Sequence, residues 1–103
     1  MAASDLVRIH IAMEELEKKG YEISKGKWCC STCTTADFDT NKFVYYHEQD
    51  AERLNASQCI PRGDTFHIGW GEDGDLDEIC AAFKKQEFKV IKPKSTATRI
   101  GLQ

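Results

Sequence analysis

The hydrophobic pattern near the N-terminus has the spacing of an amphipathic helix. Its apolar positions step by three and four residues and form one stripe: Leu6, Ile9, Met13 and Leu16. Ser4 or Asp5 can cap the start of this helix, and Gly20 can end it in a left-handed conformation. The sequence therefore predicts a helix from about residue 5 to residue 19.

A second stripe of this kind lies closer to the C-terminus. Asp75, with Glu78 three residues later, is typical of a capped helix start. The apolar positions of this segment are again spaced by three and four: Leu76, Ile79, Cys80 and Phe83. A second helix that faces the core is therefore predicted after residue 75, and a shorter one is expected from Glu48 to about Asn55.

Short runs of β-branched and aromatic residues outside these helices predict strands. In chain order the runs are residues 21–23, 43–47, 65–70, 88–91 and 98–100. In the third run Phe66, Ile68 and Trp70 share one face. The last run, 98–100, is expected at an edge of the sheet.

The order of these elements predicts the fold class. Strands and helices do not alternate regularly enough for a doubly wound fold. We therefore expect an α+β fold with a small, mostly antiparallel sheet and two or three helices packed on it. A chain of 103 residues is close to the commonest domain size, so residues 1–103 are expected to form a single domain.

The charged residues are distributed unevenly along the chain. Residues 35–83 carry eleven acids and three bases, net −8, whereas residues 84–103 carry six bases and one acid, net +5. Such asymmetry is common when an acidic face and a basic edge complement each other within one fold. It also fits an acidic surface for a protein partner with a basic surface. Nucleic-acid binding is disfavoured, because the basic stretch is short and carries no aromatic stacking platform.

Neither an export signal nor a membrane helix is expected from the apolar runs. The first twenty residues have no cationic stretch followed by an apolar one, and no apolar run approaches the ~20 residues that a membrane helix needs. We therefore expect a cytoplasmic protein without membrane contact, whose five cysteines are reduced thiols. Five is an odd number, which also argues against a fully paired set of disulfides.

Three of the five cysteines form a cluster at Cys29, Cys30 and Cys33. Cys30 and Cys33 make a C-x-x-C pair at the start of a predicted helix or tight turn. Unpaired backbone amides at such a position favour a thiolate, which suits metal binding or redox exchange. The alternative is that the thiols are only structural and pack as small apolar side chains.

A closed zinc site needs four ligands, and the C-x-x-C pair supplies two of them. With Cys29 as a third ligand, a fourth would have to come from a residue that only folding can bring near. The candidates are Cys59, Cys80, His47 and His67. Zinc is the metal that such a site would take, and its candidate ligands are Cys29, Cys30, Cys33 and His47. Redox exchange is less favoured, because a thioredoxin-like site needs a β-α-β setting that this region lacks.

A second candidate site lies where the strand at 43–47 meets the predicted short helix. His47 is followed by Glu48, Gln49 and Asp50, so polar side chains gather at the rim of the sheet. His47 can act there as a metal ligand or as a general base that a carboxylate orients. The structural alternative is that Glu48 and Asp50 favour a helix N-terminus and that His47 is a hydrogen-bonded strand residue.

Three motifs occur together in this chain: W-C-C-S-T-C at 28–33, F-V-Y-Y-H-E-Q-D-A-E-R at 43–53 and T-R-I at 98–100. The combination resembles an uncharacterised bacterial family that is catalogued only as a domain of unknown function. Its members have aromatic-x-C-C-x-T-C, a strand ending in F-H-E-Q-D-x-E-R, and a closing T-R-I. The resemblance implies no activity. It implies that the cysteine cluster, the H-E-Q-D motif and Arg99 belong to one unit, and we expect them to lie close together.

No complete catalytic constellation is visible, so we expect a protein that is not an enzyme. The first hypothesis is a small binding or regulatory protein that acts through its acidic middle, for example by neutralising a basic toxin as immunity proteins do. Its candidate contacts are Glu72, Asp73 and Asp75. The alternative is a metal-binding module or a thiol redox protein built on Cys30 and Cys33 with His47.

Overall fold

The structure, a computed structural model, describes residues 4–26, 35, 38–95 and 98–103. The cysteine cluster at 29–33 therefore lies outside the described residues. In chain order the elements are α1 (Asp5–Lys18), β1 (Glu22–Lys25), β2 (Phe43–Tyr46), α3 (Glu48–Ala51), β3 (Phe66–Trp70), α4 (Leu76–Lys85), β4 (Val90–Ile91) and β5 (Ile100–Leu102). Among these described elements, no helix has the length and apolar character needed to cross a membrane.

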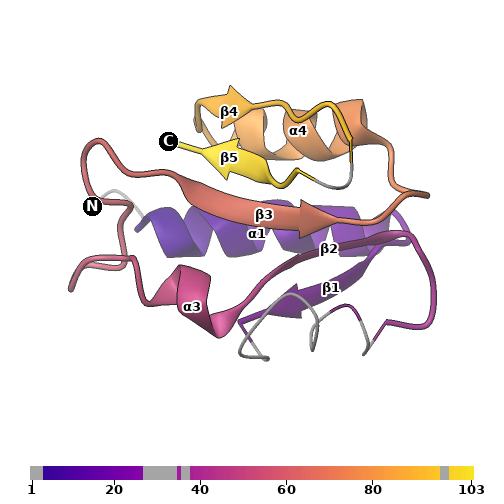
Figure 1. Ribbon diagram of the computed structural model, residues 1–103, viewed down its shortest axis with the longest axis horizontal. Coiled ribbons are helices and arrows are strands. Elements are labelled where there is room, and N and C mark those ends of the chain that lie inside the picture. The colour runs from indigo at the N-terminus through magenta and orange to yellow at the C-terminus, as the bar shows by residue number, and fades with distance from the viewer. Residues whose placement is uncertain (1–3, 27–34, 36–37, 96–97) are drawn as a thin grey trace.

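The strands form one five-stranded sheet in the order β1-β2-β3-β5-β4 (Figure 1). β1 pairs with β2 in parallel, and the other three neighbouring pairs are antiparallel. Three helices accompany the sheet in the described part of the chain. The predicted α+β class, with a mostly antiparallel sheet and helices packed on it, is therefore confirmed.

The position of the last strand differs from the prediction. The sequence predicts an edge strand at 98–100, but β5 lies inside the sheet, between β3 and β4. Ile100 pairs with Ile68 of β3, and Leu102 pairs with Val90 of β4. Ile100 and Leu102 are fully buried, because β5 has a neighbouring strand on each side. The edge prediction is wrong, and the two-residue β4 forms that edge instead.

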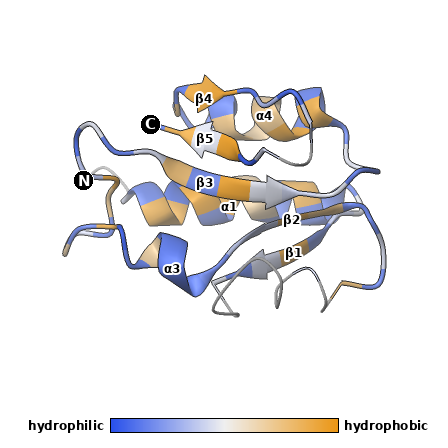
Figure 2. Ribbon diagram, viewed as in Figure 1, coloured by the Kyte–Doolittle hydropathy of each residue, from blue (hydrophilic) through white to orange (hydrophobic). Residues whose placement is uncertain are grey.

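α1 and α4 pack on one face of the sheet and bury the two predicted apolar stripes. In Figure 1, α1 passes behind β3. Figure 2 shows hydrophobic and hydrophilic residues along both helices, as expected when one side of a helix faces the core and the other faces solvent. The fully buried side chains of the two helices are Ile9, Ala12, Met13, Leu16, Ile79 and Phe83.

The predicted helix starts are confirmed, and one predicted helix is shorter than expected. The Ser4 hydroxyl caps α1 by accepting a hydrogen bond from the amide of Val7. The Asp75 carboxylate caps α4 by accepting hydrogen bonds from the two amides that follow Leu76. The helix predicted from residue 48 to about residue 55 is a single turn that ends at Ala51.

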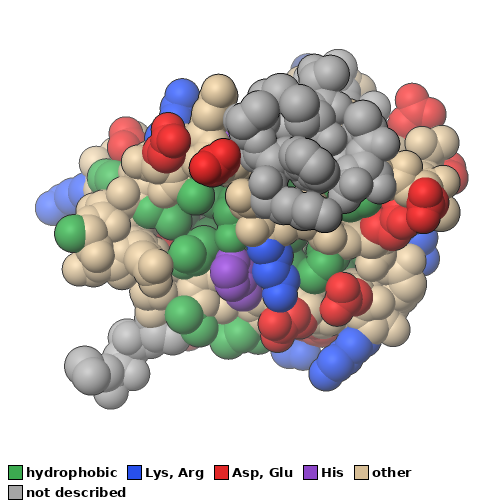
Figure 3. All heavy atoms as spheres, turned by 90° about the horizontal axis from the view of Figure 1, so that it is seen from below, with side chains coloured by type: hydrophobic (Ala, Val, Ile, Leu, Met, Phe, Trp, Pro, Cys, Tyr) green, Lys and Arg blue, Asp and Glu red, His purple; other side chains and the backbone are tan. Residues whose placement is uncertain are grey.

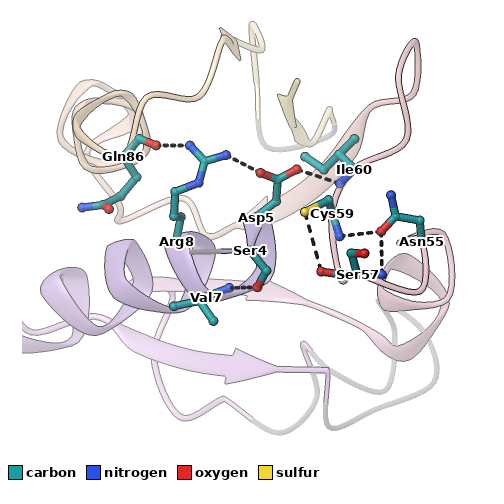
Figure 4. Close-up of polar contacts among 9 residues, drawn as sticks. All are labelled: Ser4, Asp5, Val7, Arg8, Asn55, Ser57, Cys59, Ile60 and Gln86. Carbon is teal, nitrogen blue, oxygen red and sulfur yellow. Dashed lines mark hydrogen bonds and ion pairs between the residues drawn. The ribbon is translucent and has the colours of Figure 1, made fainter. Parts of the chain in front are cut away.

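The first turn of α1 is tied to two segments that are distant in sequence (Figure 4). The Asp5 carboxylate accepts a hydrogen bond of 2.7 Å from the amide of Ile60 and forms an ion pair with Arg8. Arg8 donates over 2.5 Å to the carbonyl of Gln86, at the end of α4, and its guanidinium lies 4.4 Å from the centre of the Phe88 ring. The helix is therefore held against both the loop before β3 and the turn after α4.

The face of the sheet opposite the core carries aromatic side chains of β2. Val44 and Tyr46 belong to the core, so strand alternation places Phe43 and Tyr45 on the other side. The Tyr45 ring lies across Gly69 of β3, because a Cβ atom at Gly69 would be 2.0 Å from Tyr45 Cζ. Any other residue at position 69 would therefore displace this ring.

Replacement of Gly69 by alanine is expected to destabilise the fold. The new methyl group would overlap the Tyr45 ring, and overpacking of this kind typically costs about 1–3 kcal/mol. Urea denaturation followed by circular dichroism measures the free energy of unfolding. In a Tyr45→Ala background the same substitution should cost clearly less, because the ring is gone. An equal cost in both backgrounds would contradict this packing.

Candidate functional site

Three residues of the predicted motifs meet at the end of β2. His47 follows β2 and is the N-cap of α3, and Asp50 is the third residue of that helix. Arg99 comes from a distant part of the chain, directly before β5. Its guanidinium forms an ion pair with the Asp50 carboxylate and lies 3.1 Å from the His47 ring. The structure therefore brings the H-E-Q-D and T-R-I motifs into direct contact.

The Asp50 carboxylate is at the centre of this contact. Its side chain is only 5% exposed, and a buried carboxylate needs hydrogen-bond donors or an opposite charge. Oδ2 accepts a hydrogen bond of 3.0 Å from the backbone amide of His47, which closes the first turn of α3. The same oxygen accepts a hydrogen bond from Arg99 Nη2. Asp50 thus caps the helix and neutralises Arg99 at once.

The His47 ring is neutral in this arrangement. Arginine stays protonated and only donates, so Nη1 of Arg99 must donate to a lone pair on His47 Nε2. We infer that the ring proton is on Nδ1, which lies 3.2 Å from Asp50 Oδ2 but is not aligned with it as a hydrogen bond. Burial lowers the pKa of His47, Asp50 raises it, and Arg99 and Arg53 lower it further.

Arg99 joins the helix to the sheet. Besides Asp50 and His47, it donates over 2.7 Å to the carbonyl of His67 in β3, and its guanidinium carbon lies 6.0 Å from the centre of the Tyr45 ring. Its Nε–H group is buried and has no acceptor among the described residues. Burial and the charge of Arg99 also lower the pKa of the His67 ring. On the face where α3 lies, seen in Figure 3, histidine, basic and acidic side chains lie side by side.

This arrangement fixes the Asp50–Arg99 ion pair and leaves the His47 ring with no free lone pair for catalysis or metal binding. A general base or a metal ligand needs a free nitrogen lone pair. The Nε2 lone pair accepts the hydrogen bond from Arg99, and Nδ1 faces Asp50. His47 would therefore have to release Arg99 before it could bind a metal ion or accept a proton from a substrate.

Two of the candidate fourth ligands, Cys59 and Cys80, form no hydrogen bond or ion pair with His47, Asp50 or Arg99. Cys80 is buried in the core, where burial raises the pKa of its thiol. Cys59 is partly exposed in the loop before β3, with Sγ 3.6 Å from the carbonyl oxygen of Ser57 (Figure 4). Within the described residues no group of three or more His, Cys, Asp or Glu side chains could hold a metal ion. The zinc site stays a prediction, because three of its candidate ligands lie outside the described residues: Cys29, Cys30 and Cys33.

The members of the contact differ from the sequence motif. Glu48 and Gln49 are exposed on α3. Tyr45 and the carbonyl of His67 border Arg99, although the sequence analysis did not identify them. A backbone carbonyl carries no sequence signal. For Tyr45 the only available signal is the alternation of the strand, which places it on the same face as His47.

A pocket of about 270 Å³ lies beside the first turn of α1, away from this contact. It is lined by Asp5, residues 60–64 and Gln103. Asp5 already accepts a hydrogen bond from the amide of Ile60 and pairs with Arg8 (Figure 4). The other charged side chains of the pocket, Arg62 and Asp64, are exposed. The pocket therefore presents no buried, free charge that would define a ligand.

In comparisons with known proteins, the chain matches no family model, no curated protein and no solved structure. The resemblance to a bacterial domain of unknown function therefore stays a prediction. Any function must be inferred from the residues themselves.

Arg99→Gln is expected to lower the free energy of unfolding by about 3 kcal/mol, because it leaves the buried Asp50 carboxylate without a counter-charge. Urea denaturation measures this loss. The double variant with Asp50→Asn should lose less than the sum of the two single variants, since no unpaired charge remains. Arg62→Gln, at an exposed position, is the matched control. A change of about 0.5 kcal/mol or less in Arg99→Gln would show that the ion pair has no structural role.

Proposed function

We propose that this protein is a small binding protein, not an enzyme, which recognises a basic protein surface through one acidic end of its fold. The acidic end comprises five side chains from β1, the segment before β2 and the turn between β3 and α4. They are Glu22, Asp39, Glu72, Asp73 and Asp75. A toxin with a basic surface is one partner that such an end could neutralise.

Backbone hydrogen bonds hold these segments beside one another. The Glu22 carboxylate accepts a hydrogen bond of 3.0 Å from the amide of Asp39. The amide of Asp73 donates over 3.0 Å to the carbonyl of Asn41, which fixes the turn after β3 beside the start of β2. The five acids therefore lie at one end of the sheet, although they span more than fifty positions of the sequence.

The observation that carries the proposal is that the acidic end has no ion pair within the described residues. Acidic side chains elsewhere pair with bases, as Glu14 does with Lys25 at 3.0 Å. Within the described part of the chain, none of the five acids forms an ion pair. The ammonium group of Lys42 is close by, but it is directed at the carbonyl of Lys19 and the ring of Tyr21.

Acids that form no ion pair within the described residues favour a partner rich in lysine and arginine. Like charges repel one another, and a basic partner relieves that repulsion on binding. Complementary charge also raises the rate of association and discriminates against acidic proteins.

Charge reversal of the acidic end is expected to weaken partner binding. The tagged wild type and a Glu72→Lys/Asp73→Lys variant would be used to capture proteins from cells that produce the protein. We expect the wild type to retain a basic protein. The purified partner should bind the variant with an affinity at least about tenfold lower than its affinity for the wild type. The affinity of the wild type should also fall as the salt concentration rises.

The matched control changes the net charge by the same amount at the opposite end of the fold. Glu52 follows α3 and Asp64 precedes β3, both far from the turn between β3 and α4 (Figure 1). A Glu52→Lys/Asp64→Lys variant should bind the partner as the wild type does. The proposal fails if the two variants lose affinity equally, or if the wild type retains no basic partner.

A further inference from the structure

The ammonium group of Lys42 occupies a cation subsite beside the acids of the acidic end. The subsite consists of the ring of Tyr21, whose centre lies 4.7 Å from Lys42 Nζ, and the carbonyl of Lys19, which accepts a hydrogen bond of 3.4 Å from the same nitrogen. Lys19 is the C-cap of α1. An aromatic face and the last carbonyls of a helix both carry partial negative charge. The subsite therefore attracts a cation through groups that have no net charge of their own.

Hydrogen bonds connect the cation subsite to the acidic end. The Tyr21 hydroxyl accepts a hydrogen bond of 2.9 Å from the amide of Asp75, and the carbonyl of Lys42 accepts one of 3.0 Å from the amide of Glu22. The end of α1, the start of β1 and the turn between β3 and α4 lie at the same end of the molecule (Figure 1). A basic side chain that approaches these acids therefore arrives beside the Tyr21 ring.

Lys42 is held loosely in the cation subsite. Its hydrogen bond of 3.4 Å is longer than the usual range of about 2.7–3.2 Å for an N–H donor and a carbonyl. Among the described residues its ammonium group forms no ion pair. Lys19 and Gly20, which border the subsite, are exposed, so the subsite opens to solvent. Another cation can therefore take the place of Lys42.

We propose that the cation subsite takes an arginine side chain of the basic partner, and that Lys42 fills it in the free protein as an internal competitor. This inference rests on the proposed function, because it names the side chain that the acidic end selects. A guanidinium is planar and has several N–H donors, so it can stack on the Tyr21 ring and donate to the Lys19 carbonyl at once. An ammonium group is more strongly hydrated, which favours the return of the displaced Lys42 to water.

Occupation of the subsite by Lys42 lowers the apparent affinity for the partner. A ligand that binds only the open subsite loses affinity in proportion to the fraction of molecules in which the subsite is open. If Lys42 fills the subsite in about nine molecules out of ten, its removal tightens binding about tenfold. The competitor therefore selects for partners that place an arginine at this point.

Isothermal titration calorimetry of the full chain with a penta-arginine peptide, blocked at both ends, tests this competition. Lys42→Ala should bind the peptide about tenfold more tightly than the wild type does. Lys18→Ala is the matched control, because it removes one exposed positive charge from the end of α1 and leaves the subsite filled. It should tighten binding by less than about twofold. Equal gains for the two variants would overturn the proposal, because charge alone would then explain both.

Nuclear magnetic resonance of the wild type follows Lys42 itself and needs no variant to fold. Because the ammonium group lies 4.7 Å from the centre of the Tyr21 ring, the ring current should shift the signals of the adjacent methylene protons. Saturation with the penta-arginine peptide should return these signals to the position of an exposed lysine such as Lys18. A bound peptide that leaves them unchanged would overturn the inference.

The charge-reversed variant Glu72→Lys/Asp73→Lys separates this failure from a failure of the proposed function. If Lys42 stays in place but the variant binds the peptide more weakly than the wild type, the cation subsite is wrong and recognition of basic groups by the acidic end stands. If the wild type does not bind the peptide, or the variant binds it equally well, the result counts against both.

Discussion

The ion pair between Asp50 and Arg99 is the constraint on which the arrangement around β5 depends. A carboxylate that is 5% exposed can stay charged only with donors at hand. Its donors come from two places: the amide of His47 at the end of β2, and the guanidinium just before β5. One buried charge therefore both starts α3 and fixes the approach of the last strand to the middle of the sheet.

The two faces of the sheet differ in the contacts that they make. One face packs on α1 and α4 and supplies the apolar burial that stabilises the fold. On the other face Gly69 lets the Tyr45 ring lie directly on the backbone, and Arg99 reaches past it to the carbonyl of His67. Polar contacts can form on this second face because its side chains do not belong to the hydrophobic core.

Charge is used in two ways in this structure. The buried acid, Asp50, has its partner within the chain, and the pair is part of the architecture. The acids of the acidic end have no such partner among the described residues, so their charge is open to an outside one. This contrast is the basis of the binding role proposed for the acidic end, whereas the contact of His47 with Arg99 is part of the architecture.

The core helices and their caps could be predicted from the sequence, because both depend on the spacing of near neighbours along the chain. The stripe of α1 and the cap at Asp75 are of this kind. The charge imbalance is a property of composition and needs no structure. The interior position of β5 and the contact of Arg99 with Asp50, 49 positions away, could not be predicted in this way. Strand order and buried ion pairs depend on the path of the whole backbone, which no local pattern records.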